Sequence, residues 1–137
     1  MSTKKMFSNT IIVLSLIASI FYFSSCSQGT IVDKIVEKTA AVANEQCPRA
    51  LDRETRLDSV THPAPNTLGS YMTLINIQKD SLAIDPAVIE THLVQVVKTN
   101  KEWESLRKLN VLFRFVYFDK NGDLALKKVI TPEQYNK

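Results

Sequence analysis

The stretch V-L-F-R-F-V-Y-F at Val111–Phe118, followed by D-K-N-G at Asp119–Gly122, decides the fold of this 137-residue chain. Aromatic and β-branched residues fill its first part almost throughout, which is typical of a buried β-strand. The Asn-Gly pair favours a tight hairpin turn, because both residues tolerate positive φ angles. We therefore expect residues 123–131 to return as the last strand, which Pro132 ends.

A second hairpin is expected nearer the N-terminus. Residues 56–62 and 70–76 are predicted strands, and the second alternates two sets of side chains with the period of a strand. The loop between them contains Pro63, Pro65 and Gly69, which interrupt regular structure.

A helical pattern precedes each hairpin. Apolar residues recur at spacings of three and four from Ile31 to Ala43, and Pro48 ends this pattern. Asp85-Pro86 is typical of a helix start, and apolar residues then recur over 88–97, with a short second helix expected within 101–109. The order α-β-β-α-β-β predicts an α+β two-layer sandwich, in which a four-stranded antiparallel sheet packs on two helices.

The N-terminus has the features of a targeting signal. Lys4 and Lys5 precede the apolar run Thr10–Phe23, which is shorter than the roughly 20 residues of a membrane-spanning helix. F-S-S-C at Phe23–Cys26 then resembles the lipobox of bacterial lipoprotein signal peptides, which implies cleavage before Cys26 and a lipid on its thiol. An uncleaved anchor and an ordinary secretory signal are the alternatives.

These features divide the chain into a signal peptide over residues 1–25, a tether over 26–30 and a single α+β domain over 31–137. Removing Lys4 and Lys5 from the 17 basic residues leaves 15 against 14 acidic ones, so charge does not support nucleic-acid binding. The predicted partners are the membrane, through lipid on Cys26, and a protein. Ser27 follows Cys26 in place of an Asp retention signal, so we expect the outer membrane, facing the periplasm.

Little in the sequence points to cofactor or metal chemistry. Three glycines in the whole chain exclude a glycine-rich phosphate loop, and two cysteines exclude a cysteine-rich zinc site. Asp119, Asn121 and Asp123 resemble a calcium loop only loosely, because Gly122 stands at the fourth position, where an EF-hand needs glycine at the sixth. We expect no catalytic set, no metal and no cofactor.

Five positions are chemically interesting. Cys47 is an unpaired thiol if Cys26 carries lipid, and the alternative is a small, inert, buried side chain at the end of the first helix. Arg53, Arg56 and Asp58 are candidate binding residues, although a solvated turn explains this charged stretch equally well. His92 lies on the apolar stripe of the second helix and is expected to pack in the core.

Two stretches resemble a group of small, uncharacterised bacterial lipoproteins or secreted proteins. One is Cys47-Pro48 followed by Asp52 and Thr55–Ser59, and the other is Phe115–Asp119 with Gly122 and Ile130–Pro132. The resemblance covers most of residues 35–132 and implies a compact domain without implying an activity. Further cysteines of that group are absent from this chain, so it implies no disulfide here.

Taken together, these features favour a non-enzymatic, membrane-anchored module of the bacterial envelope that binds a protein partner or supports an envelope assembly. Two alternatives remain open. One is an immunity-type inhibitor of a periplasmic toxin, and the other is a thiol-dependent enzyme or redox sensor that uses Cys47. The identity of the partner and the oligomeric state do not follow from the sequence.

Overall fold

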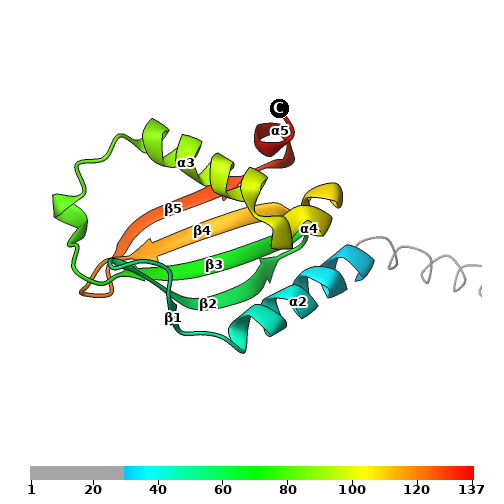
Figure 1. Ribbon diagram of the computed structural model, residues 1–137, viewed down its shortest axis with the longest axis horizontal. Coiled ribbons are helices and arrows are strands. Elements are labelled where there is room, and N and C mark those ends of the chain that lie inside the picture. The colour runs from blue at the N-terminus through cyan, green and yellow to red at the C-terminus, as the bar shows by residue number, and fades with distance from the viewer. Residues whose placement is uncertain (1–29) are drawn as a thin grey trace, which may run out of the picture. The chain divides into compact units, whose positions relative to one another are not determined.

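The computed structural model shown in Figure 1 describes residues 30–137. Its elements are, in chain order, α2 (Thr30–Asn44), β1 (Arg49–Ala50), β2 (Thr55–Ala64), β3 (Thr67–Leu74), a 3-10 turn (Lys79–Ser81), α3 (Pro86–Thr99), a second 3-10 turn (Lys101–Trp103), α4 (Glu104–Lys108), β4 (Leu112–Phe118), β5 (Leu124–Ile130) and α5 (Pro132–Tyr135). The predicted signal peptide over 1–25, Cys26 and residues 27–29 of the predicted tether lie outside the described residues. None of the described helices is long and apolar enough to cross a membrane.

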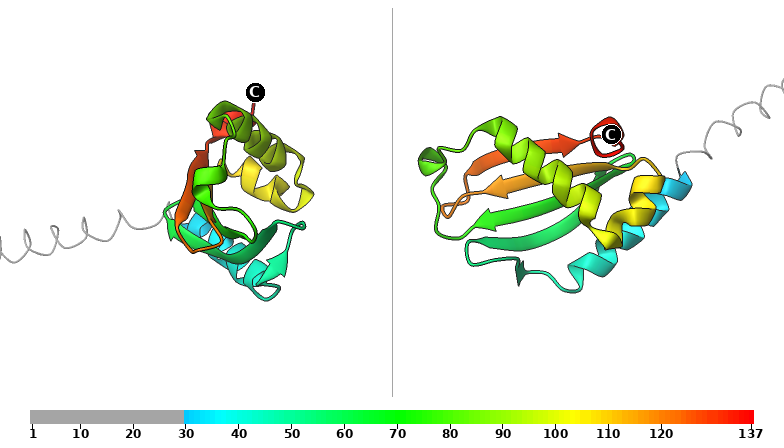
Figure 2. Two further views of the ribbon diagram at one scale, coloured as in Figure 1. Left: turned by 90° about the vertical axis from the view of Figure 1, so that its left-hand side faces the viewer. Right: turned by 45° about the horizontal axis from the view of Figure 1, so that its top comes forward.

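The strands form one mixed sheet in the order β1-β2-β3-β4-β5. The pairs β1/β2, β2/β3 and β4/β5 are antiparallel, whereas the central pair β3/β4 is parallel. At the centre of the sheet, Ser70 of β3 lies opposite Val60 of β2 on one side and opposite Phe115 of β4 on the other. Helices α3 and α4 pack against one side of this sheet (Figure 2).

The structure confirms the α+β class, but the prediction of a four-stranded antiparallel sheet on two helices is wrong. Arg49–Ala50 adds a fifth strand, too short to show an alternating pattern. The chain between β3 and β4 includes α3 and α4, and a connection of this length lets two strands run parallel. Pro132 ends the last strand as expected, but it also begins α5.

Helix α3 begins at Asp85-Pro86 as expected, but the face that it turns to the sheet is not the predicted one. The Asp85 carboxylate accepts a hydrogen bond from the Ala87 N–H at 2.8 Å, and Pro86 occupies the first turn. Leu93 and Val97 are the buried residues of the helix. His92 is exposed, so the prediction that it packs in the core is wrong.

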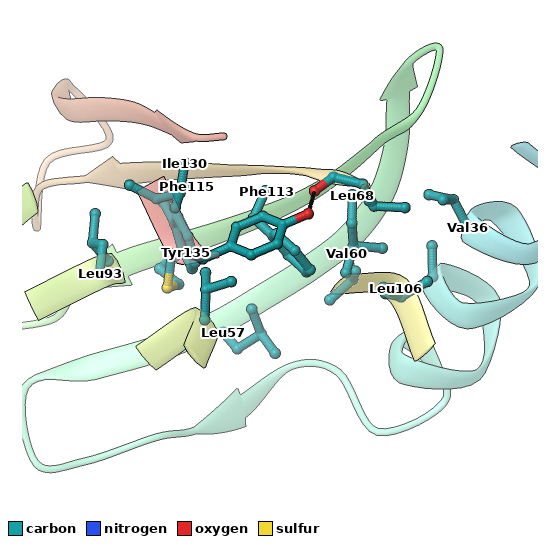
Figure 3. Close-up of a cluster of buried hydrophobic side chains, with 14 residues drawn as sticks. Val36, Leu57, Val60, Leu68, Leu93, Leu106, Phe113, Phe115, Ile130 and Tyr135 are labelled. Carbon is teal, nitrogen blue, oxygen red and sulfur yellow. Dashed lines mark hydrogen bonds between the residues drawn. The ribbon is translucent and has the colours of Figure 1, made fainter. Parts of the chain in front are cut away.

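Aromatic side chains close the core over β4 (Figure 3). The Trp103 ring stacks on Phe113 with centroids 5.0 Å apart, and Tyr135 meets Phe113 edge-on at 5.7 Å. The Tyr135 hydroxyl donates to the Val111 carbonyl at 2.9 Å. Burial raises the pKa of Tyr135 to about 12, so the phenol stays protonated and keeps this hydrogen bond at physiological pH.

The β4–β5 turn is organised by one buried carboxylate, that of Asp119, which is 2% exposed. It accepts hydrogen bonds from the backbone N–H groups of Asn121, Asp123 and Lys79, at 2.8, 3.0 and 3.2 Å. Burial raises the pKa of Asp119, but these donors outweigh that effect and hold the pKa below its ordinary value. The carboxylate thus joins the hairpin turn to the segment that follows β3.

Candidate functional site

A groove of about 490 Å³ opens between α2 and the junction of α3 with α4, above β2 and β3. We call it the α2 groove. Its lining residues are Leu57, Val60, Leu68 and Ser70 on the floor, Ile35, Lys38, Thr39, Val42, Ala43 and Gln46 on the α2 wall, Asn100, Glu102 and Trp103 on the opposite wall, and Arg49 of β1.

Two polar clamps hold α2 beside the sheet and so keep the groove open. Near the start of the helix, the Asp33 carboxylate accepts from the Asn66 backbone N–H at 2.7 Å and lies 3.0 Å from His62 Nε2. The Asn66 donor first, and then His62, lower the pKa of Asp33 against the opposing effect of burial. At the last residue of α2, the Asn44 side chain accepts from the Val60 N–H at 2.7 Å and donates to the Val60 carbonyl at 2.6 Å.

Helix α2 has more apolar residues than its packing on the sheet requires. Val36 and Ala40 are buried against the core, at 0% and 4% exposed. Ile35 and Val42 are 37% and 54% exposed, and both line the α2 groove. Exposed aliphatic side chains beside an apolar groove are typical of an interaction site.

The polar side chains of the groove are few. Ser70 on the floor is 6% exposed, and its hydroxyl makes no hydrogen bond with any described residue. Lys38 is exposed on the α2 wall and forms no ion pair within residues 30–137. Arg49 donates to the Gln46 side chain at 3.0 Å, and Glu102 is exposed on the opposite wall. An apolar floor with charged residues at the rim is a composition typical of protein interfaces.

Of the His, Cys, Asp and Glu side chains that commonly ligate metals, the groove lining has Glu102. Within the part of the chain that the structure describes, no three His, Cys, Asp or Glu side chains are arranged to hold a metal ion. The groove lining includes neither a cysteine nor a histidine, so Ser70 has no neighbouring imidazole there to act as a general base.

Cys47 lies just beyond α2, half-buried against the core, and is not among the residues that line the groove. Its thiol lies 3.4 Å from the Ala43 carbonyl, with the geometry of a donated hydrogen bond. Cys47 has no disulfide partner among the described residues. The inert alternative expected a buried side chain and the structure shows a half-buried one, so the reactivity of Cys47 stays a prediction.

The structure brings Arg56 and Asp58 together and leaves Arg53 apart. Arg56 Nε forms an ion pair with the Asp58 carboxylate, which also accepts from Thr73 Oγ1 at 2.6 Å. Neither Arg56 nor Asp58 lines the groove. Arg56 directly precedes the buried Leu57 along β2, so Arg56 points to the face of the sheet opposite Leu57. Arg53 is exposed in the loop before β2.

Sequence reasoning missed the residues that build the groove. Ser70, Lys38 and Asn44 carry no recognisable motif, because their roles depend on how α2 sits beside β2. One signal was present: Ile35 and Val42 lie on the same helix as the buried Val36 and Ala40 but turn to another face. An apolar stripe wider than one packing face is a sign of a second contact.

Comparison with known proteins finds a matching family and solved structures of the same fold. Residues 30–126 match the model of the family described as a domain of unknown function, DUF8479. No curated protein gives a significant match to the sequence.

Three solved structures share this fold. A protein of Pseudomonas aeruginosa classed as secreted superposes with a TM-score of 0.71 at 14% identity, covering 82% of this chain and 99% of that one. The pilotin EpsS of the Vibrio vulnificus type 2 secretion system gives 0.64 at 12% identity, covering 78% of this chain and 94% of that one. The type II secretion system pilotin AspS of Vibrio cholerae gives 0.59 at 16% identity, covering 77% and 94%.

Proposed function

We propose, because the chain belongs to the DUF8479 family and shares its fold with two pilotins, that it is a lipid-anchored, non-enzymatic protein of the bacterial envelope that binds a protein partner in the α2 groove. The observation that carries this proposal is the groove itself. Its floor is apolar, its α2 wall presents Ile35 and Val42 to solvent, and its charged residues lie at the rim.

The hydrogen bonding of the floor favours a helical partner segment. Strand β3 is paired with β2 on one side and β4 on the other, and the outward N–H and carbonyl of Val60 on β2 are taken by Asn44. A partner therefore finds no free strand edge there and has to satisfy its own backbone, as a helix does. From Ile35 to Ala43 the helical part of the α2 wall is roughly 12 Å long, enough for about two turns of a second helix.

A lipid on Cys26 would keep the groove within reach of a bilayer. Lipid on Cys26 would leave four peptide steps before Thr30, the first residue of α2, which span at most about 14 Å. A partner bound in the groove would therefore be held near the periplasmic surface of the outer membrane.

Labelling of cells with an alkyne analogue of palmitate tests the anchor. We expect the protein to carry the label and to fractionate with outer membranes, and we expect Cys26→Ala to remove the label. The Cys47→Ala variant is the matched control and should keep it. Label that persists in Cys26→Ala would overturn the proposed lipidation.

Photocrosslinking in living cells tests the groove. A photoreactive benzoylphenylalanine at Val42, in the groove, is compared with one at Val88, which is similarly exposed on α3 at 59% but outside the groove. We expect a discrete crosslinked protein from position 42 and none from position 88. Identical crosslinks from both positions, or none from position 42, would contradict partner binding in the groove.

A further inference from the structure

We infer that Ser70 and Lys38 determine which helix the α2 groove accepts: an acidic amphipathic helix whose apolar stripe contains one hydrogen-bonding side chain, opposite the Ser70 hydroxyl. This inference rests on the proposed function and names the chemistry of the partner.

Ser70 is a polar side chain in apolar surroundings. Across the sheet its neighbours are Val60 and Phe115, and along β3 the residues on the same face are Leu68 and Met72. It is 6% exposed, yet its hydroxyl makes no hydrogen bond with any residue from 30 to 137. Its Oγ is not among the side-chain atoms that the described residues shut off from solvent, so water can bind it while the groove is empty. A ligand that covers the hydroxyl without replacing that hydrogen bond loses free energy, so a ligand with a matching polar side chain is preferred.

The position of Ser70 directs this hydroxyl towards a ligand. The residue lines the groove floor together with Leu57, Val60 and Leu68, and it is the smallest side chain of the four. A side chain this small leaves room for a group of the ligand beside the one hydroxyl of the floor. A hydroxyl, amide or similar side chain projecting from the apolar face of a helix could reach that point and form a hydrogen bond.

The charged residues at the rim favour a partner helix with negative charge on one side. Lys38 and Arg49 lie on the α2 side of the groove, and neither forms an ion pair with any described carboxylate. Glu102 is the acidic residue on the opposite wall. Acidic side chains on the partner helix, placed along its α2 side, would complement the two cations.

A displayed library of 18-residue amphipathic peptides tests the inference even while the natural partner is unidentified. The full-length protein is held in lipid nanodiscs, and each peptide has fixed leucines on one face with one apolar position and the flanking positions randomised. We expect the wild-type protein to select Ser, Thr, Asn or Gln at the apolar position and Asp or Glu on one flank.

Ser70→Ala removes the hydroxyl with little change in volume. We expect this variant to select Ala, Val or Leu at that position and to bind the wild-type-selected peptide about tenfold more weakly, the effect of one lost hydrogen bond. A peptide with alanine there should bind Ser70→Ala more tightly than wild type, because in wild type it would cover the hydroxyl without a hydrogen-bond partner. The same selection by both proteins would overturn the role of Ser70 and leave the proposed function standing.

Lys38→Glu is compared with Lys34→Glu, which changes an exposed lysine of α2 outside the groove lining. We expect Lys38→Glu, but not Lys34→Glu, to lower the affinity for the selected peptide. A peptide with lysine in place of its acidic residue should restore binding to the Lys38→Glu protein. Equal effects of both substitutions would contradict the assigned charge. A selected peptide that binds in the groove should bind the Val42→Asp variant more weakly than wild type. If no selected peptide does so, the proposed function of the groove is contradicted.

Discussion

Asn44 completes the edge of β2 at a place where no strand lies beside it. Strand β1 covers only Arg56 and Leu57, so further along β2 the outward N–H and carbonyl of Val60 would otherwise face solvent or α2. The Asn44 amide has one donor and one acceptor group, and it satisfies both backbone groups at once. One side chain at the last residue of α2 thus fixes the helix to the sheet.

Asn44→Ala should therefore destabilise the domain. We expect a loss of about 1–2 kcal/mol in the free energy of unfolding, because two backbone groups lose their partner. Unfolding in urea measures it. Asn121→Ala is the matched control, since Asn121 is exposed and its side chain makes no hydrogen bond with the described residues, and it should change stability by less than about 0.5 kcal/mol. Equal effects would contradict the role of Asn44.

Asp119 gives stability that depends on pH. Its pKa lies below the ordinary value of 3.8 in the folded state, so ionisation stabilises the fold above pH 3.8, and this stabilisation is lost as the pH falls through the folded pKa. Asp119→Asn should lower the melting temperature at pH 7, and the difference from wild type should narrow at about pH 3. Thermal unfolding at both values measures this, and a gap of constant size would contradict it.

At the scale of elements, local chemistry predicted the β4–β5 turn and the start of α3, but the expected long loop between β2 and β3 is wrong. Pro63 lies within β2 and Gly69 within β3, and two residues, Pro65 and Asn66, join these strands. Asn121-Gly122 marked the β4–β5 turn, where Gly122 has a φ of 85°, and Asp85-Pro86 marked the start of α3. The parallel pairing of β3 with β4 was not predictable from alternation. Alternation fixes which face a side chain takes and says nothing about which strand lies beside it.

The orientation of α3 shows a related limit. Val88, His92 and Val96 are spaced by four residues, and so are Ile89, Leu93 and Val97. These two stripes are neighbours on the helix, and the sequence pattern does not choose between them. In the structure the second stripe faces the sheet, with Leu93 and Val97 buried, because an apolar Leu releases more free energy on burial than His.

Two substitutions on α3 test that orientation. We expect Leu93→Ala to cost about 2–4 kcal/mol in stability, because Leu93 is 2% exposed and its removal leaves a cavity. Val88→Ala should cost less than about 0.5 kcal/mol, because Val88 is exposed. Urea unfolding of both variants decides the matter, and a costly Val88→Ala beside a tolerated Leu93→Ala would show that the first stripe faces the core.

At the scale of the whole molecule, the structural domain extends beyond the family match. The match ends at residue 126, yet Ile130 and Tyr135 are 0% and 3% exposed in the core. The residues after 126 supply most of β5 and the whole of α5, and the Tyr135 ring covers Phe113.

Removal of residues 127–137 should abolish cooperative unfolding. The loss of Ile130 and Tyr135 removes two core side chains, each worth about 2–4 kcal/mol, from a domain whose total stability is about 5–15 kcal/mol. Removal of Asn136 and Lys137 alone is the control and should leave a cooperative transition. Near-ultraviolet circular dichroism during heating distinguishes the two, and a native-like melt of the longer truncation would contradict the expectation.

The two clamps on α2 have a mechanical consequence. In the proposed anchored protein, any tension between the membrane and a partner would enter the domain through the start of α2. The Asp33 clamp lies first on that load path, and the Asn44 clamp lies at the far end of the helix, so the two would bear the force in sequence. The central strands β3 and β4, which have a neighbouring strand on each side, would be shielded from it. Under load, the groove would open by release of α2 while the sheet stayed intact.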